Sequence, residues 1–193
     1  RVKIWQDECE AVDQGADISD WLTSALQSRE RLRLVQMAPG FVRPQSKPGL
    51  LGEKTHTRFA DLAPFLVANQ ASLDALNAEL LARGHEAVPM NRFRPNVVLR
   101  GMEPFGEHDL PAVACDAYAL GFCHPCQRCI VTTINQDNAL REQGWQPYET
   151  LAEINPVPGK ENAPAFGQNA ILLRGADSSI AVGDHLSVMD VSD

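Results

Sequence analysis

The chain has 193 residues, of which 44% are hydrophobic and 22% are charged, and its formal net charge at pH 7 is -8. These values predict a globular protein with one substantial core, and the negative charge argues against a general binder of nucleic acid or of a membrane surface. No apolar run approaches the length of a membrane span and no signal-peptide pattern opens the chain, so we expect neither a membrane protein nor a secreted one.

The first 84 residues show strand and helix signals in turn. Residues 1–5 and 31–36 alternate apolar and polar side chains, which is typical of half-exposed strands. Residues 17–27 place apolar side chains at helical spacing, with Asp17 as the expected N-cap. The segment 39–52 holds three Pro and three Gly and is expected to be a surface loop. Leucines on one face predict a second helix over 71–82, ending before Gly84.

The rest of the chain is dominated by strand patterns. We expect strands at 96–100, 112–119, 129–135, 170–174 and 185–190, and one short helix at 148–154. The segment 155–168 contains three Pro and two Gly, and it should form a long loop that borders a site. Many short strands with scattered helices predict a β-rich α+β fold, a barrel with peripheral helices.

The segment from Arg92 to Arg100 contains three arginines in nine residues, a layout suited to an oxyanion. Pro95 should hold Arg94 in an extended conformation, so that Arg94 and Asn96 point to the same side. Phe93 should then point into the core. We expect Arg92 and Arg100 to be ordinary surface arginines.

The cysteine cluster between Cys123 and Cys129 permits several interpretations. A four-iron cluster pattern fails because Thr133 stands where the fourth cysteine is needed. A c-type haem attachment fails because Gln127 and Ile130 stand at the histidine positions. A zinc site, a redox dithiol through Cys126 and one of its neighbours, and plain buried thiols all remain open.

Two features set the cluster in context. The chain has five cysteines in all, an odd number that does not suit a secreted disulfide framework, so we expect a reducing cytoplasm. Cys129 follows Arg128 and opens the expected 129–135 strand. An adjacent cation lowers the pKa of a thiol and makes it a better metal ligand or nucleophile.

These segments, together with Phe166-Gly-Gln-Asn169 and Val182-Gly-Asp184, resemble the MOSC domain family, in particular its amidoxime-reducing branch. The resemblance implies a MOSC-type β-barrel over residues 55–193, preceded at 1–54 by the end of a MOSC-associated β-barrel region with one helix. It implies a molybdenum cofactor, a pyranopterin, with Cys129 as the molybdenum ligand. The carried-over cofactor contacts are Arg94, Asn96, Arg128 and Asp61. Relatives usually have hydroxylic residues after that Asp, where this chain has Leu62 and Ala63.

The function implied is that of a cofactor-dependent oxidoreductase, or part of one, that reduces N-hydroxylated compounds. Electrons should come from an external donor protein of the cytochrome or flavin or ferredoxin reductase type. No haem, iron–sulfur cluster or pyridoxal phosphate is expected in this chain, which we expect to be a monomer. The alternatives are a sulfur carrier with a persulfide on Cys129 or Cys126, and an inactive binding module.

Overall fold

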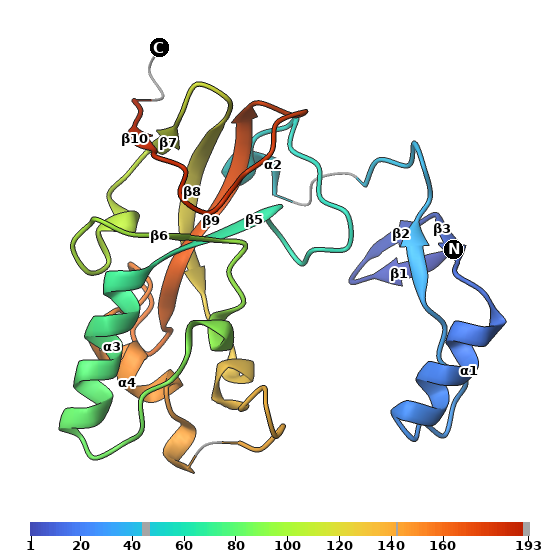
Figure 1. Ribbon diagram of the computed structural model, residues 1–193, viewed down its shortest axis with the longest axis horizontal. Coiled ribbons are helices and arrows are strands. Elements are labelled where there is room, and N and C mark those ends of the chain that lie inside the picture. Colours follow the sequence, from blue (N-terminus) through green and yellow to red (C-terminus); the bar gives the residue numbers. More distant parts are fainter. Residues whose placement is uncertain (44–46, 142, 191–193) are drawn as a thin grey trace. The chain divides into compact units, whose positions relative to one another are not determined.

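The computed structural model describes residues 1–43, 47–141 and 143–190 (Figure 1). The chain divides into two compact units. The first comprises residues 1–48 and 53–62, and the second comprises residues 49–52 and everything from residue 63 onward. Part of the expected loop at 39–52 lies outside the described residues.

The first unit contains two antiparallel ribbons and one helix. Strand β1 (Val2–Ile4) pairs with β2 (Asp7–Cys9), β3 (Ala11–Asp13) pairs with β4 (Val35–Met37), and α1 spans Ala16–Ala25. The expected strand at 1–5 and the helix at 17–27 are confirmed in outline. The predicted cap is wrong, because Gly15 is the N-cap and Asp17 lies within the first turn.

Buried Arg43 holds the first unit together. Its Nε donates to Asp7 Oδ2 at 2.8 Å, and its Nη1 donates to the carbonyl oxygens of Arg58 and Ala60 at 3.1 and 2.8 Å. A planar guanidinium can serve all these acceptors at once, which a lysine could not do. Three segments distant in sequence are thereby joined around one side chain.

The second unit is built on a six-stranded sheet with the order β10-β7-β8-β9-β5-β6. The strands are β5 (Phe65–Asn69), β6 (Val97–Leu99), β7 (Ala112–Ala114), β8 (Ala119–Gln127), β9 (Ala165–Arg174) and β10 (Ser187–Val188). All neighbours are antiparallel except β5 and β6, which are parallel.

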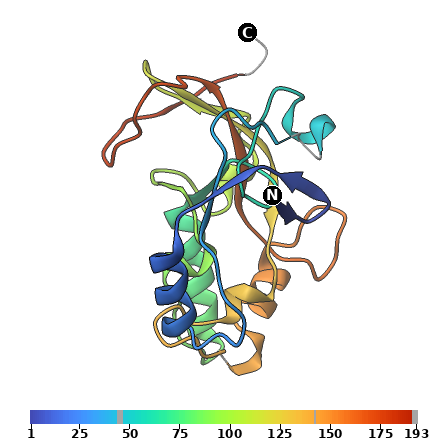
Figure 2. The same cartoon turned by 90° about the vertical axis from the view of Figure 1, so that its right-hand side faces the viewer.

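The sheet curls but does not close into a barrel, as Figure 2 shows. The register of β8 against β9 shifts at three places, and such bulges bend and twist a sheet. The short strands β6 and β10 remain as its two edges. The β-rich α+β class is therefore confirmed, whereas the described strands form half of the predicted barrel.

Two helices pack on this sheet around one apolar cluster. Helix α3 (Gln70–Ala82) connects the parallel pair β5 and β6, and it starts at the N-cap Asn69, whose Oδ1 accepts the amide of Ala71. Helix α4 spans Tyr148–Ile154, as expected, and α2 is a single turn at Pro48–Leu51. The buried cluster is formed by the side chains of Ala68, Leu73, Leu76, Leu80, Val88, Phe93, Leu151 and Phe166.

The remaining elements are four 3₁₀ turns, η1 (Met90–Phe93), η2 (Gly106–His108), η3 (Ile130–Thr133) and η4 (Gln143–Trp145). Three strand or loop predictions need correction. The expected strand at 129–135 is the turn η3, the strand at 112–119 ends at Ala114, and β9 begins inside the expected loop at 155–168.

Gly167 is a residue that this fold requires. It lies in β9 with a φ of 73°, and a Cβ there would lie 2.6 Å from the carbonyl oxygen of Val67 on the neighbouring strand. A side chain would thus face both backbone strain and a clash with a main-chain atom. Only glycine lets β9 approach β5 this closely.

We predict that Gly167→Ala lowers the free energy of unfolding by about 2–5 kcal/mol, from the left-handed backbone and the overpacking together. Gly159→Ala is a matched control, because Gly159 has a φ of 75° but no atom within 4 Å of its added Cβ. It should cost only about 1–2 kcal/mol. Urea unfolding of both variants measures the difference, and equal losses would contradict the close approach.

Candidate functional site

The aromatic ring of Phe93 is the point at which three sequence motifs meet. Its ring stacks on that of Phe166 with centroids 3.8 Å apart and planes at 18°. The guanidinium carbon of Arg128 lies 5.9 Å from the centroid of the Phe93 ring. Arg128 Nη2 also donates to the carbonyl oxygen of Phe93 at 2.8 Å. The Phe-Arg-Pro-Asn, Cys-x-Arg-Cys and Phe-Gly-Gln-Asn segments are therefore joined in the fold.

A second arginine reinforces this junction. Arg92 is 3% exposed, and its Nη1 donates to the carbonyl oxygen of Thr132 in η3 at 3.2 Å. The expectation that Arg92 is a surface arginine is wrong. The turn η1 buries Arg92 instead, and its side chain reaches from the Phe-Arg-Pro-Asn segment to the carbonyl of Thr132 in η3.

The threonines explain why the 129–135 segment is not a strand. The hydroxyl of Thr132 donates to the carbonyl oxygen of Cys129 at 3.1 Å, and that of Thr133 donates to Ile130 at 2.7 Å. Such bonds to the carbonyl three residues earlier favour a tight turn over a sheet ladder. Both threonines are buried, so β propensity yields to local hydrogen bonding.

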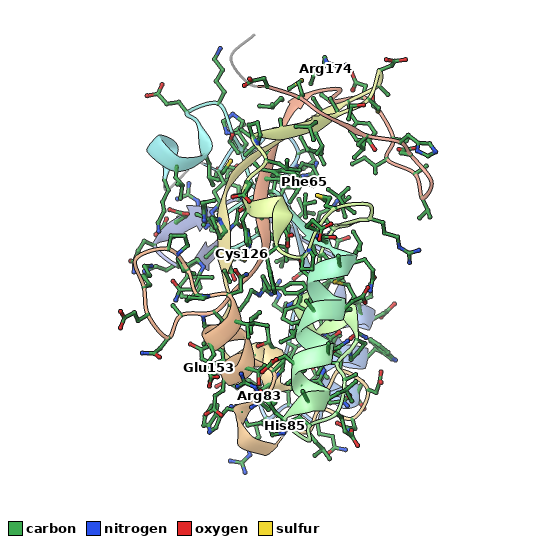
Figure 3. All side chains as sticks on the ribbon, turned by 90° about the vertical axis from the view of Figure 1, so that its left-hand side faces the viewer. Phe65, Arg83, His85, Cys126, Glu153 and Arg174 are labelled. Atoms are coloured by element: carbon green, nitrogen blue, oxygen red, sulfur yellow. The ribbon has the colours of Figure 1, made fainter. Side chains whose placement is uncertain are left out.

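Cys129 stands exposed at the start of this turn, with an extended backbone and a free thiol. The adjacent Arg128 guanidinium is not directed as the sequence suggested. Its Nη1 donates to Sγ of Cys126 at 3.0 Å, so the recorded cation–sulfur contact belongs to Cys126. Figure 3 shows Cys126 on β8. Burial raises the pKa of the third thiol, Cys123.

The geometry weighs against two of the open alternatives. Cys123 and Cys126 both lie in β8, and extended residues three apart are separated by roughly 10 Å, beyond the ~7 Å Cα reach of a disulfide. Cys126 and Cys129 are likewise both free thiols in this structure. Within the described residues, no group of three or more His, Cys, Asp or Glu side chains could hold a metal ion. Neither the dithiol nor the zinc site is supported.

The structure corrects the expected conformation of Arg94. Its φ and ψ are 53° and 48°, a left-handed conformation that ends η1, rather than the extended one predicted from Pro95. The hydrogen bond from its amide to the carbonyl of Asn91 closes that turn. The side chain is exposed, and no polar partner is recorded for it among the described residues. Arg94 is thus an unpaired cation directly after Phe93.

Asn96 has a structural task of its own. Its main-chain N–H donates to the carbonyl oxygen of Leu66, and its side-chain Oδ1 accepts the main-chain N–H of Leu66, both at 2.8 Å. This reciprocal pair extends the parallel pairing of β5 with β6. A site role for Asn96 would therefore rest on its side-chain NH₂ group, which these bonds leave available.

Asp61 belongs to the first unit, where its Oδ1 accepts the indole N–H of Trp5 at 3.2 Å. The other four predicted residues belong to the second unit. The junction at Phe93 connects the segments carrying Arg94, Asn96, Arg128 and Cys129.

Several residues fit an anionic group at this junction. Nε of Arg128 is buried and has no partner among the described residues, although the same guanidinium makes two bonds with its other nitrogens. Arg94 offers a second cation and Cys129 an exposed soft ligand. Cations and a thiolate are the groups that an oxyanion-bearing cofactor with a thiolate-accepting metal would need.

A buried polar cluster beside the Phe-Gly-Gln-Asn segment was missed from the sequence. Glu107 is fully buried and accepts a hydrogen bond from the hydroxyl of Ser72, which accepts the amide of Phe105. Next to Glu107, His108 contacts Asn155 through Nε2 at 3.0 Å. No pattern marks these residues, because they converge only when η2 packs beside α3 and β9.

Burial is the main cause that lowers the pKa of His108, and the charges of Glu107 and Asp109 offset it in part. The folded protein therefore resists protonation of a group that the unfolded chain protonates below about pH 6.5. Stability from this group is complete above that pH and is lost as the pH falls.

We predict that His108→Gln reduces the loss of unfolding free energy between pH 7.5 and pH 5.5. The exposed His56 serves as the control, since His56→Gln should leave the pH dependence of the parent unchanged. Denaturant unfolding at the two pH values measures both effects. If the free energy of unfolding of the His108 variant depended on pH as in the parent, the burial of His108 would not contribute to the pH dependence of stability.

The sequence profile of the MOSC domain family matches residues 54–187, so the chain belongs to this family. It is 31% identical to human mitochondrial amidoxime-reducing component 1 over 184 residues, which cover 92% of this chain and 52% of that protein. It is 29% identical to the Xenopus laevis protein of the same name over 174 residues, or 86% and 49% of the two chains.

A second kind of relative is the molybdenum cofactor sulfurase of Arabidopsis thaliana, 30% identical over 152 residues, covering 74% of this chain and 19% of that protein. The chain spans about half the length of the amidoxime-reducing relatives and a smaller share of the sulfurase. These similarities connect it with molybdenum cofactor proteins. Among the helices of the described segments, none is long and apolar enough to cross a bilayer.

Proposed function

We propose that this chain binds the molybdenum cofactor and forms the cofactor-binding part of a reductase of N-hydroxylated compounds. The observation that carries the proposal is the junction at Phe93. It joins the segment of the unpaired Arg94 to that of the exposed Cys129 through the bonds of Arg128. The similarity to amidoxime-reducing components supports the substrate class.

Each residue has a distinct part in this proposal. Cys129 supplies the thiolate ligand, because a soft metal prefers a soft sulfur donor. Arg94 and the unpaired Nε of Arg128 bind oxyanions of the pyranopterin, and Asn96 keeps β6 in register while offering its NH₂ group. Asp61 is proposed as an additional contact. The cofactor, when bound, supplies the two-electron redox chemistry, and the chain orients it and keeps its ligand sphere in place.

The proposal extends to the partner, the compartment and the domain division. Electrons are supplied by a separate donor protein of the cytochrome or flavin or ferredoxin reductase type. The five cysteines are all free thiols, which suits a reducing compartment such as the cytoplasm. We assign residues 55–193 to the MOSC domain and 1–54 to the end of a preceding β-barrel region, and we expect a monomer.

A second candidate function is that of a sulfur carrier, and one observation favours it. The guanidinium of Arg128 donates to the sulfur of Cys126 at 3.0 Å, a contact that would also stabilise an anionic persulfide. The similarity to a molybdenum cofactor sulfurase is compatible with this role. The carrier hypothesis places the reactive sulfur on Cys126 or Cys129.

Metal analysis distinguishes the two candidates. Protein produced in a host that makes the cofactor should contain close to one molybdenum per chain if the reductase proposal holds. Metal-free protein that accepts sulfane sulfur from a persulfide donor would support the carrier. Stoichiometric zinc would contradict both.

We predict that Cys129→Ser abolishes molybdenum retention and N-hydroxyl reduction, whereas Cys123→Ser and Cys126→Ser keep much of both. Serine is nearly the same size but stays protonated at neutral pH, so it does not replace a thiolate on molybdenum. Molybdenum content and reductase activity with a supplied electron donor are measured for all three variants. An active Cys129→Ser enzyme, or equal losses at the three cysteines, would overturn the ligand assignment.

We predict that Arg94→Ala lowers cofactor affinity about tenfold or more without changing stability, since its side chain is exposed and unpaired. Asn96→Ala should also destabilise the fold, because it removes the acceptor for Leu66. Asn96→Asp keeps that acceptor and removes only the NH₂ group, so it separates the two roles. Cofactor retention and urea unfolding are measured together. Parent-like retention in Arg94→Ala would exclude a contact.

A further inference from the structure

The second unit contains a cavity of about 1370 Å³ between β6 and the segment 180–188. In Figure 1 these two parts belong to the two edges of the curled sheet. The cavity thus occupies the place at which a closed barrel would have its missing side. Of the candidate cofactor residues, Asn96 lines this cavity, whereas Arg94, Arg128 and Cys129 do not, so the cavity borders the segment that carries the junction at Phe93 but is not centred on it.

The walls of this cavity are mostly apolar. They include side chains of the apolar cluster inside the curl of the sheet, namely Phe65, Val97, Leu99, Leu110, Val113 and Leu186. All but Val113 are only partly buried. Sites with this kind of lining bind the apolar bodies of organic ligands, and this cavity is larger than the roughly 300–1000 Å³ usual for them.

Four titratable side chains line the cavity, those of Arg100, Tyr118, Asp184 and His185, and among the described residues Arg100 is the one fixed charge without a recorded partner. Asp184 accepts the hydroxyl of Tyr118 at 2.8 Å and the amide of Ala181 at 2.9 Å, and these bonds lower its pKa. His185 is exposed beside it. Arg100 is exposed on the opposite wall, and within the described part of the chain no partner is recorded for it.

The register of the sheet places Arg100 directly after the end of β6, among the residues that line the cavity. Asn69 is opposite Leu99 in the parallel pair, and Arg100 is the next residue after β6. Its backbone therefore follows β6 at the end of the sheet where α3 begins, and Arg100 lines the cavity together with Val97 and Leu99 of that strand. One unpaired cation in the wall of a mostly apolar cavity complements an anion with an apolar body.

We propose that this cavity binds an amphipathic organic anion, with its carboxylate or phosphate head at Arg100 and its apolar chain between β6 and the segment 180–188. A strand from another polypeptide fits less well. β6 has three residues and β10 has two, too few for a paired strand of the usual five or six. The proposal does not depend on the molybdenum cofactor.

Calorimetric titration of the intact chain tests the proposal with three probes of one length: dodecanoate, dodecyl phosphate and dodecanol. We expect at least one anion to bind, and to bind at least about tenfold more tightly than the alcohol. The comparison of the two anions identifies the head group. Arg100→Gln should lower the affinity for that anion about tenfold and remove its advantage over dodecanol.

Two further variants assign the effect to the cavity. Arg29→Gln is the matched control, because Arg29 is an exposed arginine that does not line the cavity and has no recorded partner in the described segments, and its binding should equal that of the parent. Leu110→Trp places a larger side chain in the cavity and should weaken all probes while the protein remains folded by circular dichroism.

Three results would overturn the proposal. The first is that neither anion binds, and the second is that an anion binds Arg100→Gln as tightly as it binds the parent. The third is a concentration-dependent dimer in light scattering that Leu110→Trp disrupts, because this would identify a second copy of the chain as the occupant.

Discussion

The ring of Phe93 between Phe166 and Arg128 is the contact on which the candidate site depends. Phe166 presses it from the sheet side, and the guanidinium of Arg128 covers it and binds its carbonyl oxygen. An aromatic ring fixed in this way leaves little freedom to the residue that follows it. Arg94 is accordingly held outside the core in a left-handed conformation, and Cys129 is held next to Arg128 at the head of a tight turn.

The polar contacts around this ring divide the arginines by role. Arg92 and Arg128 are tied to backbone carbonyls and to a sulfur, so they hold the segments together. Arg94 and Arg100 are exposed, and in our proposals they bind ligands at two different places, the junction at Phe93 and the cavity beside β6. Arg92, Arg94 and Arg100 of one nine-residue segment, and Arg128 beside Cys129, thus have separate roles. The sequence alone does not reveal this division, because the role of each arginine depends on which backbone carbonyls the fold brings near its guanidinium.

The incomplete closure of the sheet has consequences of its own. Bulges between β8 and β9 bend the sheet enough to create an apolar interior, but the short strands β6 and β10 remain its two edges and do not pair with each other. Tyr118 then anchors the exposed segment 180–188 through Asp184, and burial raises the pKa of Tyr118 to about 12, so this hydroxyl remains a donor throughout the physiological range. The sheet is therefore left open between β6 and the segment 180–188, and the Tyr118–Asp184 bond holds that segment in place.

Sequence patterns alone determined the class of the fold, helices α3 and α4 and the family resemblance, since these depend on local periodicity and on short segments. They failed where tertiary contacts compete with local preference. Thr132 and Thr133 favour a strand by propensity, yet their hydroxyls bond back to carbonyls and form η3. Arg94 precedes a proline, yet it closes the turn after buried Phe93. The guanidinium of Arg128 donates to the sulfur of Cys126 rather than to that of the adjacent Cys129. The buried cluster of Glu107, Ser72 and His108 exists only because packing brings distant segments together.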